Sequence, residues 1–166
     1  MTTTSLGTAM IHRVRAAGLI VESRRILLVR HRTPGTERDW WIPPGGGLKP
    51  EDAGVLDTAR REVFEETGLT ATVSRIAYVN EWRQASTGIH HVEFFVPVDS
   101  HTGKASLRHI RQDEAEAEFI KELRWLERPQ LEGLIVYPAW LRTDWFWQDA
   151  AGGFPLTRYT GVELEQ

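Results

Sequence analysis

Residues 61–69 read Arg-Glu-Val-Phe-Glu-Glu-Thr-Gly-Leu, and this stretch decides the fold. Small and apolar side chains recur through it and just before it at steps of three and four residues: Leu56, Ala59, Val63 and Thr67. That period is typical of a helix with one buried face, and glycine is the residue that most often follows a helix end. The sequence therefore predicts a helix over residues 54–67 with Gly68 as its C-terminal cap.

The same helix carries three glutamates on one narrow band. At about 100° per residue, Glu62, Glu65 and Glu66 fall close together, beside the apolar stripe. Glu62 and Glu66 are one turn apart, and like charges at that spacing repel by about 0.2–0.5 kcal/mol. A divalent cation with oxygen ligands is the natural candidate to offset this repulsion at the edge of the buried face.

A glycine-rich loop precedes the helix. Pro43-Pro44-Gly45-Gly46-Gly47 forbids regular structure, and its glycines let the backbone approach metal ions and phosphates closely. Mg²⁺ that joins carboxylates to phosphate oxygens neutralises a pyrophosphate group and orients an attacking water. Arg61 precedes the first glutamate and could orient it, because guanidinium pairs well with carboxylate. Loop and helix together indicate phosphate chemistry.

In these residues the sequence resembles the Nudix hydrolase family. The family's box is a glycine, five residues, a glutamate, seven residues, and then Arg-Glu-apolar-any-Glu-Glu-any-Gly-apolar. Residues 61–69 match the whole second half, and Gly47 stands fourteen residues before Arg61, as the box requires. A weaker resemblance covers about residues 12–140. One position departs from the box: its isolated glutamate falls on Ala53, and we expect Asp52 or Glu51 to replace it.

The resemblance implies roles for particular residues. Glu62 and Glu66 would be the main metal ligands, Glu65 a ligand or helper, and Glu62 the most frequent choice to activate water. The backbone carbonyl of Gly46 or Gly47 would complete the metal shell. A later loop often supplies a further acid, for which Glu118 is the first candidate and Glu122 the second. The implied cofactor is Mg²⁺, with Mn²⁺ as a substitute.

The implied fold is α/β: an α/β/α sandwich with a mixed β-sheet between the helix of residues 54–67 and a C-terminal helix. Residue patterns predict strands at 14–21, 26–30 and 119–126, a hairpin of 70–82 with 89–98, and a helix at 138–147. We predict a flexible N-terminus at 1–10, a single domain at 11–150 and a C-terminal tail at 151–166.

Four residues outside the box are candidates for substrate binding. Trp40 and Trp41 could stack on a base, although neighbours on a strand point to opposite faces and core packing is the more frequent role. Glu81 and Arg83 stand at a strand end where a pocket rim could lie, and a sheet-edge role is equally consistent with the sequence. The acidic run at 113–118 is either a solvated loop or the source of the extra metal ligand.

The length, net charge and composition of the chain limit its possible partners and cellular compartment. A chain of 166 residues with a net charge of −3 offers no field that would gather nucleic acid, and its lack of cysteine excludes disulfides and zinc-thiolate sites. No stretch reaches the roughly 18 apolar residues that span a bilayer. We expect a cytoplasmic protein that acts on a small nucleotide-type molecule, without nucleic acid or membrane partners. The tryptophan-rich C-terminus could pack as a helix or form a homodimer surface.

The predicted function is Mg²⁺-dependent hydrolysis of the pyrophosphate bond in a nucleoside diphosphate derivative or a nucleoside triphosphate. Nucleoside triphosphates, nucleotide sugars of the ADP-ribose type and dinucleoside polyphosphates all contain this bond. Two other classes stay open. One is a nucleotide-binding regulator on the same scaffold with weak or no catalysis, which Ala53 favours. The other is a structural interaction module that binds no metal.

Overall fold

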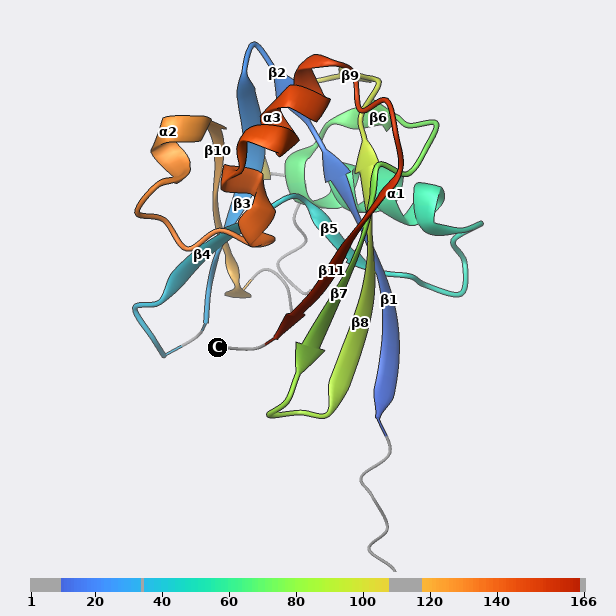
Figure 1. The fold of residues 1–166 in the computed structure, drawn as a ribbon, viewed down its shortest axis with the longest axis vertical. Coiled ribbons are helices and arrows are strands. Elements are labelled where there is room, and N and C mark those ends of the chain that lie inside the picture. Colours follow the sequence, from blue (N-terminus) through green and yellow to red (C-terminus); the bar gives the residue numbers. More distant parts are fainter. Residues whose placement is uncertain (1–9, 34, 108–117, 165–166) are drawn as a thin grey trace, which may run out of the picture.

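A computed structural model describes residues 10–33, 35–107 and 118–164 (Figure 1). The predicted N-terminal segment 1–10 lies outside them except for Met10, and so does most of the acidic run at 113–118. The strands in chain order are β1 (Ile11–Leu19), β2 (Val21–Glu22), β3 (Arg25–Arg32), β4 (Asp39–Ile42), β5 (Gly45–Gly47), β6 (Thr70–Thr72), β7 (Tyr78–Gln84), β8 (Ile89–Pro97), β9 (Ser100–Thr102), β10 (Ile120–Glu127) and β11 (Arg158–Leu164). The helices are α1 (Val55–Thr67), α2 (Arg128–Leu131), the 3₁₀ helix η3 (Ala139–Arg142) and α3 (Asp144–Ala151).

Two sheets form the middle of the molecule. The larger has the strand order β11-β7-β8-β1-β5 and is mixed, since β1 runs parallel to β8 and β7 parallel to β11 while the other pairs are antiparallel. The second has the order β10-β3-β2, with β4 also paired to β3. A short pair, β6 with β9, stands apart from both.

Each face of the larger sheet packs on a different helix. On one face, Ala16 and Val96 share a core with Ala59 and Val63 of α1. On the other, side chains of the sheet share a core with Trp140 of η3 and with Phe146 of α3: Leu19, Tyr78 and Phe95. Figure 1 shows α3 and α1 on opposite sides of these strands. The predicted α/β/α sandwich with a mixed sheet is therefore confirmed.

Helix α1 forms where the sequence predicts it. Its C-terminal cap is Gly68, whose φ of 74° is in the left-handed region and whose N–H donates to the carbonyl of Phe64 at 2.8 Å. Glycine adopts this conformation without the steric cost that a Cβ brings. Close approach of α1 to the sheet depends on a second glycine, because a Cβ on Gly18 would lie 2.3 Å from Cγ2 of Val63.

The C-terminal part of the chain differs from the prediction. The stretch expected to be a tail at 151–166 instead contains β11, which pairs in parallel with β7 at the sheet edge. The helix expected at 138–147 is two helices, η3 and α3, because Thr143 between them has extended backbone angles. A short helix, α2, was not predicted. In the described part of the chain, no helix has the length and apolar character to cross a membrane.

The first two predicted strands, at 14–21 and 26–30, lie mainly in different sheets. A tight turn connects β2 to β3, and its residues Ser23 and Arg24 both have positive φ. Across this turn β2 pairs with β3, whereas β1, which contains most of the strand predicted at 14–21, does not pair with β3. β1 lies in the larger sheet and β3 in the other, so the chain changes sheets near Ile20 and residue patterns alone could not reveal that.

Candidate active site

Helix α1 and strand β5 bring the predicted glutamates against the glycine loop. Glu62 and Glu66 are buried, with 1% and 2% of their surface exposed, whereas Glu65 is partly exposed. Strand β5 pairs with β1, and this pairing fixes its backbone beside Glu62 and Glu66 in the second half of the helix. The backbone N–H of Gly45 donates to Oε2 of Glu66 at 2.9 Å. The carboxylate of Glu66 is thereby held at the loop.

Gly46 lies so close to Glu62 that no side chain fits between them. A Cβ on Gly46 would stand 2.4 Å from Oε1 of Glu62 and 2.5 Å from its Cδ. Such distances are far below van der Waals contact, so any other residue at position 46 would displace the carboxylate. This is the physical reason for a glycine at this place in the loop.

Arg61 connects the loop, the helix and the turn before it. Its guanidinium donates to Oε1 of Glu62 at 2.6 Å, to Oε2 of Glu65 at 2.9 Å and to the carbonyl of Gly47 at 3.0 Å. It also forms a two-point contact with Asp52, with both hydrogen bonds at 2.9 Å. The positive charge of Arg61 therefore offsets repulsion among the carboxylates from within the protein.

Asp52 precedes Ala53, the position of the missing box glutamate, and its carboxylate contacts Arg61. Its Oδ2 also accepts the backbone N–H of Lys49 and the hydroxyl of Thr58, both at 2.9 Å. The hydrogen bonds from Arg61 hold the pKa of Asp52 far below its ordinary value. Of the two acids that could replace the glutamate missing at Ala53, the structure brings Asp52 against Arg61, while Glu51 is exposed.

The donor atoms fit a hard divalent cation in kind. Carboxylate and backbone carbonyl oxygens are the ligands that Mg²⁺ takes, and Glu62, Glu65, Glu66 and the carbonyl of Gly47 present them within one network. Within residues 10–33, 35–107 and 118–164, however, no three acidic or histidine side chains converge on one point as a ready-made metal site. Arg61 occupies oxygens of Glu62 and Glu65, so a cation would compete with its guanidinium for them.

The structure gives less information about the two candidate metal ligands from the later loop. Glu118 is exposed just before β10 begins. Glu122, on β10, pairs with Arg30 at 3.2 Å and with Arg124 at 2.5 Å. A metal-ligand role for Glu118 stays a prediction, and the acids at 113–117 lie outside the described residues.

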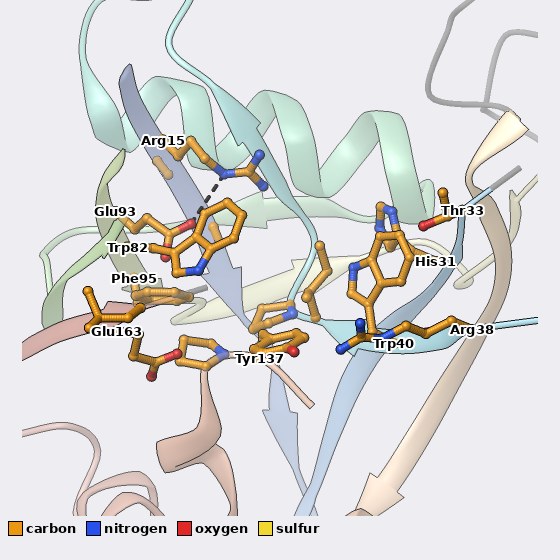
Figure 2. Close-up of a pocket in the computed structure, with 16 residues that line it drawn as sticks. Arg15, His31, Thr33, Arg38, Trp40, Trp82, Glu93, Phe95, Tyr137 and Glu163 are labelled. Carbon is orange, nitrogen blue, oxygen red and sulfur yellow. Dashed lines mark ion pairs between the residues drawn. The ribbon is translucent and has the colours of Figure 1, made fainter. Parts of the chain in front are cut away.

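A cavity of about 420 Å³ opens beside the glycine loop, between the larger sheet and β4 (Figure 2). Its volume is in the range of pockets that hold small organic ligands. Aromatic side chains and two carboxylates line much of it: Trp40, Trp82, Phe95, Tyr137, Glu93 and Glu163. Figure 2 shows the indole rings of Trp40 and Trp82 on opposite sides of this space.

Arg15 lies at the border between the cavity and the glycine loop. Its Nη2 donates to the carbonyl of Gly45 at 3.3 Å, and its Nε lies 3.4 Å from Oε1 of Glu93, an ion pair drawn in Figure 2. A positive charge here stands between the aromatic walls and the carboxylates of α1. The arrangement suits a ligand with a flat ring in the cavity and phosphates at the loop.

Of the residues predicted to bind substrate, the structure places one in the cavity. Trp40 lines it, whereas Trp41 is 3% exposed and belongs to the hydrophobic core, in accord with the alternation of side chains along β4. Glu81 and Arg83, the two residues of β7 predicted to bind substrate, do not line this cavity. Trp82, between them, lines it, and Glu81 instead contacts His90 at 2.5 Å and Tyr159 at 2.8 Å.

Each cavity tryptophan is backed by a histidine directly opposite on the neighbouring strand. Trp40 stacks on His31 with ring centroids 5.6 Å apart, and Trp82 lies on His91 at 5.1 Å. Burial, with a smaller contribution from Arg15, lowers the pKa of both imidazoles to about 4. Both histidines are therefore neutral in the folded protein at pH 7, and they fix the tryptophan rings.

These histidines predict a loss of stability in mild acid. A group with a lowered pKa in the folded state stabilises the fold above its unfolded pKa, here 6.5, and this contribution is lost as the pH falls towards 4. For the buried His91 we expect about 1–3 kcal/mol. Urea unfolding at pH 7.5 and 4.5 measures it: the difference between the two pH values should be smaller in His91→Gln than in the parent. An unchanged difference in that variant would exclude His91 as a cause.

Sequence reasoning missed Arg15, Trp82, Glu93, Tyr137 and Glu163. Trp82 stands between Glu81 and Arg83 at the strand end where a pocket rim could lie, and a period-2 pattern could have suggested that its indole faces away from these two charged side chains. No local signal marks Glu163, because the pairing of β11 with β7 joins residues about 80 positions apart in the chain.

Comparisons with known proteins agree with the fold and the box. The family model of the NUDIX domain matches residues 12–146. An RNA pyrophosphohydrolase of Brucella ovis is 38% identical over 66 residues, which are 40% of this chain and 35% of that protein. The chain thus matches about a third of the length of this curated relative.

Solved structures share the fold at low sequence identity. The E. coli ORF135 protein has a TM-score of 0.64 at 21% identity and covers 86% of this chain and 94% of its own. A MutT NUDIX hydrolase from Burkholderia pseudomallei has a TM-score of 0.63 at 23% identity, with 79% and 95% covered. Since the family model spans most of the chain and the geometry of residues 45–66 supplies the elements of the box, the protein belongs to the NUDIX family.

Proposed function

We propose that this protein hydrolyses the pyrophosphate bond of a nucleoside triphosphate or nucleoside diphosphate derivative with the aid of Mg²⁺. One observation carries the proposal: Glu62, Glu65 and Glu66 lie in one network with the glycine loop, next to an aromatic cavity of nucleoside size. Phosphoryl transfer asks mainly for positioning and charge stabilisation, which such a site can provide. Cytoplasmic localisation and a homodimer stay predictions.

The proposed reaction is attack by water on a phosphorus atom of the diphosphate linkage. The bond from that phosphorus to the bridging oxygen breaks, the bridging oxygen leaves with the other phosphate, and two phosphate-bearing products result. Bound Mg²⁺ would neutralise phosphate charge and lower the pKa of water. Glu62 is our candidate to take the water proton, while Arg61 positions Glu62 and Glu65 through its hydrogen bonds.

A substrate and metal panel tests this function. The parent protein is incubated with a nucleoside triphosphate, ADP-ribose, a dinucleoside polyphosphate and a 5′-triphosphorylated oligonucleotide, each with Mg²⁺, Mn²⁺ or EDTA. The oligonucleotide is included because the Brucella relative is named an RNA pyrophosphohydrolase. We expect cleavage of at least one class with either metal and none with EDTA. Cleavage that survives EDTA would contradict a divalent cation requirement.

A second candidate is a nucleotide-binding regulator with weak or no catalysis. Two observations favour it: position 53 is alanine, and Arg61 occupies carboxylate oxygens that a metal would need. This candidate predicts that nucleotides bind in calorimetry while every panel member remains intact with Mg²⁺. Asp52 speaks against it, because it supplies a carboxylate to Arg61 in place of the missing glutamate.

A further inference from the structure

Two of the charged groups that line the cavity are already paired with each other. Arg15 pairs with Glu93, and the other oxygen of Glu93 accepts from Nδ2 of Asn80 at 3.3 Å. These contacts lie at the end of the cavity near the glycine loop, as Figure 2 shows for Arg15 and Glu93. The groups at this end therefore neutralise one another and have little capacity left for selecting a ring.

The second carboxylate that lines the cavity, Glu163, has surroundings that differ from those of Glu93. It comes from β11, directly opposite Trp82 on β7, and it lines the cavity together with Phe95 and Pro138. Figure 2 shows its carboxylate on the side of the cavity where Phe95 and Trp82 lie. Oε1 accepts the backbone N–H of Ala139 at 3.3 Å, a long hydrogen bond. Apolar burial, more than the nearby charge of Glu93, raises the pKa of this carboxyl.

While it is ionised, a carboxylate has no proton to donate and can contact a ligand only by accepting hydrogen bonds. It has lone pairs left on both oxygens, and an acceptor in apolar surroundings gains more from a donor than one in water. The matching ligand must offer N–H or O–H groups at the edge of a flat ring, because two indoles wall the cavity that Glu163 borders, Trp82 on the side of Glu163 and Trp40 on the opposite side.

Among the common bases, guanine offers two adjacent donors, N1–H and the 2-amino group, on one edge. Adenine and cytosine offer one amino group beside a ring nitrogen that accepts, and uracil offers one N–H between two carbonyls. In these three bases an acceptor atom lies next to the donor, and its lone pair would repel the oxygens of the carboxylate. We propose that the cavity binds the base of a guanine nucleotide between Trp40 and Trp82, and that Glu163 selects guanine by accepting both donors.

This inference rests on the proposed function only for the orientation of the ligand. With the base at Glu163, the ribose and phosphates would extend past Arg15 towards Gly45 and the carboxylates of α1. Base selection itself concerns binding and needs no catalysis. Glu163 is therefore a specificity-determining residue far from the reacting phosphorus, and its effect should appear in affinity and KM and leave kcat nearly unchanged.

Binding of four monophosphates without metal tests the proposal independently of hydrolysis. Calorimetry is run with GMP, AMP, CMP and UMP on the parent, on Glu163→Gln and on the control Glu132→Gln, an exposed glutamate at the end of α2. We expect the parent and the control to prefer GMP. Glu163→Gln should weaken GMP by about 10- to 100-fold, the loss expected for hydrogen bonds to a charged group, and change the other three by less than about threefold.

Two results would overturn the assignment. Equal affinity of the parent for the four nucleotides would show that Glu163 selects nothing. If 2′-deoxy-GMP bound to the parent as weakly as GMP binds to Glu163→Gln, the carboxylate would hold the ribose and not the base. Thermal unfolding of Glu163→Gln confirms that the variant folds. Selective GMP binding without any cleavage in the substrate panel would refute the proposed function and leave this inference standing.

Discussion

Replacing Glu62 by glutamine should lower kcat by about 10²–10⁴-fold, the range that a group acting in proton transfer contributes. The change removes the negative charge that we propose holds the metal and takes the water proton, and it keeps nearly the same shape at a buried position. Glutamine can no longer accept a proton from water, and it is a weaker ligand for a hard cation. Steady-state kinetics on the best member of the substrate panel, with saturating Mg²⁺, measures the effect.

The matched control is Glu132→Gln, which makes the same chemical change at an exposed site on α2 and should retain the parent rate. A fall in rate has meaning only if the variant is folded, so its circular dichroism spectrum and unfolding midpoint are compared with the parent. Full activity of Glu62→Gln in Mg²⁺ would remove Glu62 from the reaction and with it the role that the box assigns.

Replacing Arg61 by alanine should lower the free energy of unfolding by about 3–5 kcal/mol, the cost of removing one partner from a buried ion pair. Arg61 is the shared partner of Asp52 and Glu62, whose side chains are 3% and 2% exposed, and without it their charges lie close together with little water. Urea unfolding at pH 7.5 gives the free energy. Arg61→Lys keeps the charge and loses the planar fork, so its loss should be smaller.

The pH dependence of the same pair provides a second readout. Arg61 lowers the pKa of Asp52, so the pair stabilises the fold above the ordinary pKa of an aspartate, and this contribution is lost as the pH falls below that value. The stability of Arg61→Ala should therefore change less than that of the parent between pH 5 and pH 3. A variant as stable as the parent at pH 7.5 would contradict the central position of Arg61 in the network.

The sequence predicted α1 and its carboxylates well because the information is local. A 3.6-residue period, a capping glycine and the spacing of Glu62 and Glu66 all lie within a few turns of one helix. The hairpin was predicted in part: β7 and β8 pair across a short turn, but the first predicted strand, 70–82, is divided into β6, which pairs with β9, and β7, which begins at Tyr78. The predicted close approach of the glycine backbone is found, since Gly46 lies against Glu62, but the prediction that residues 43–47 lack regular structure was wrong, because Gly45–Gly47 form β5 and pair with β1.

The cavity could not be predicted because it depends on pairing between distant segments. Glu163 reaches it only through the parallel pairing of β11 with β7, and Arg15 through the change of sheets after β1. A bulge near Gly161, whose φ is 98°, interrupts β11 and breaks the side-chain alternation by which a strand is recognised in a sequence. Which of two adjacent residues faces inward, as for Trp40 and Trp41, follows from register, and register is a tertiary property.

Mass spectrometry of the products formed in ¹⁸O-labelled water tests the central claim most directly. The parent and Glu62→Gln are incubated with the substrate panel and Mg²⁺. We expect the parent to open a diphosphate linkage into two phosphate-bearing products, one of which carries a single ¹⁸O, and Glu62→Gln to leave the substrate essentially intact. An unopened linkage in every substrate, with nucleotide still bound by the parent, would contradict the account and identify the protein as a nucleotide-binding regulator.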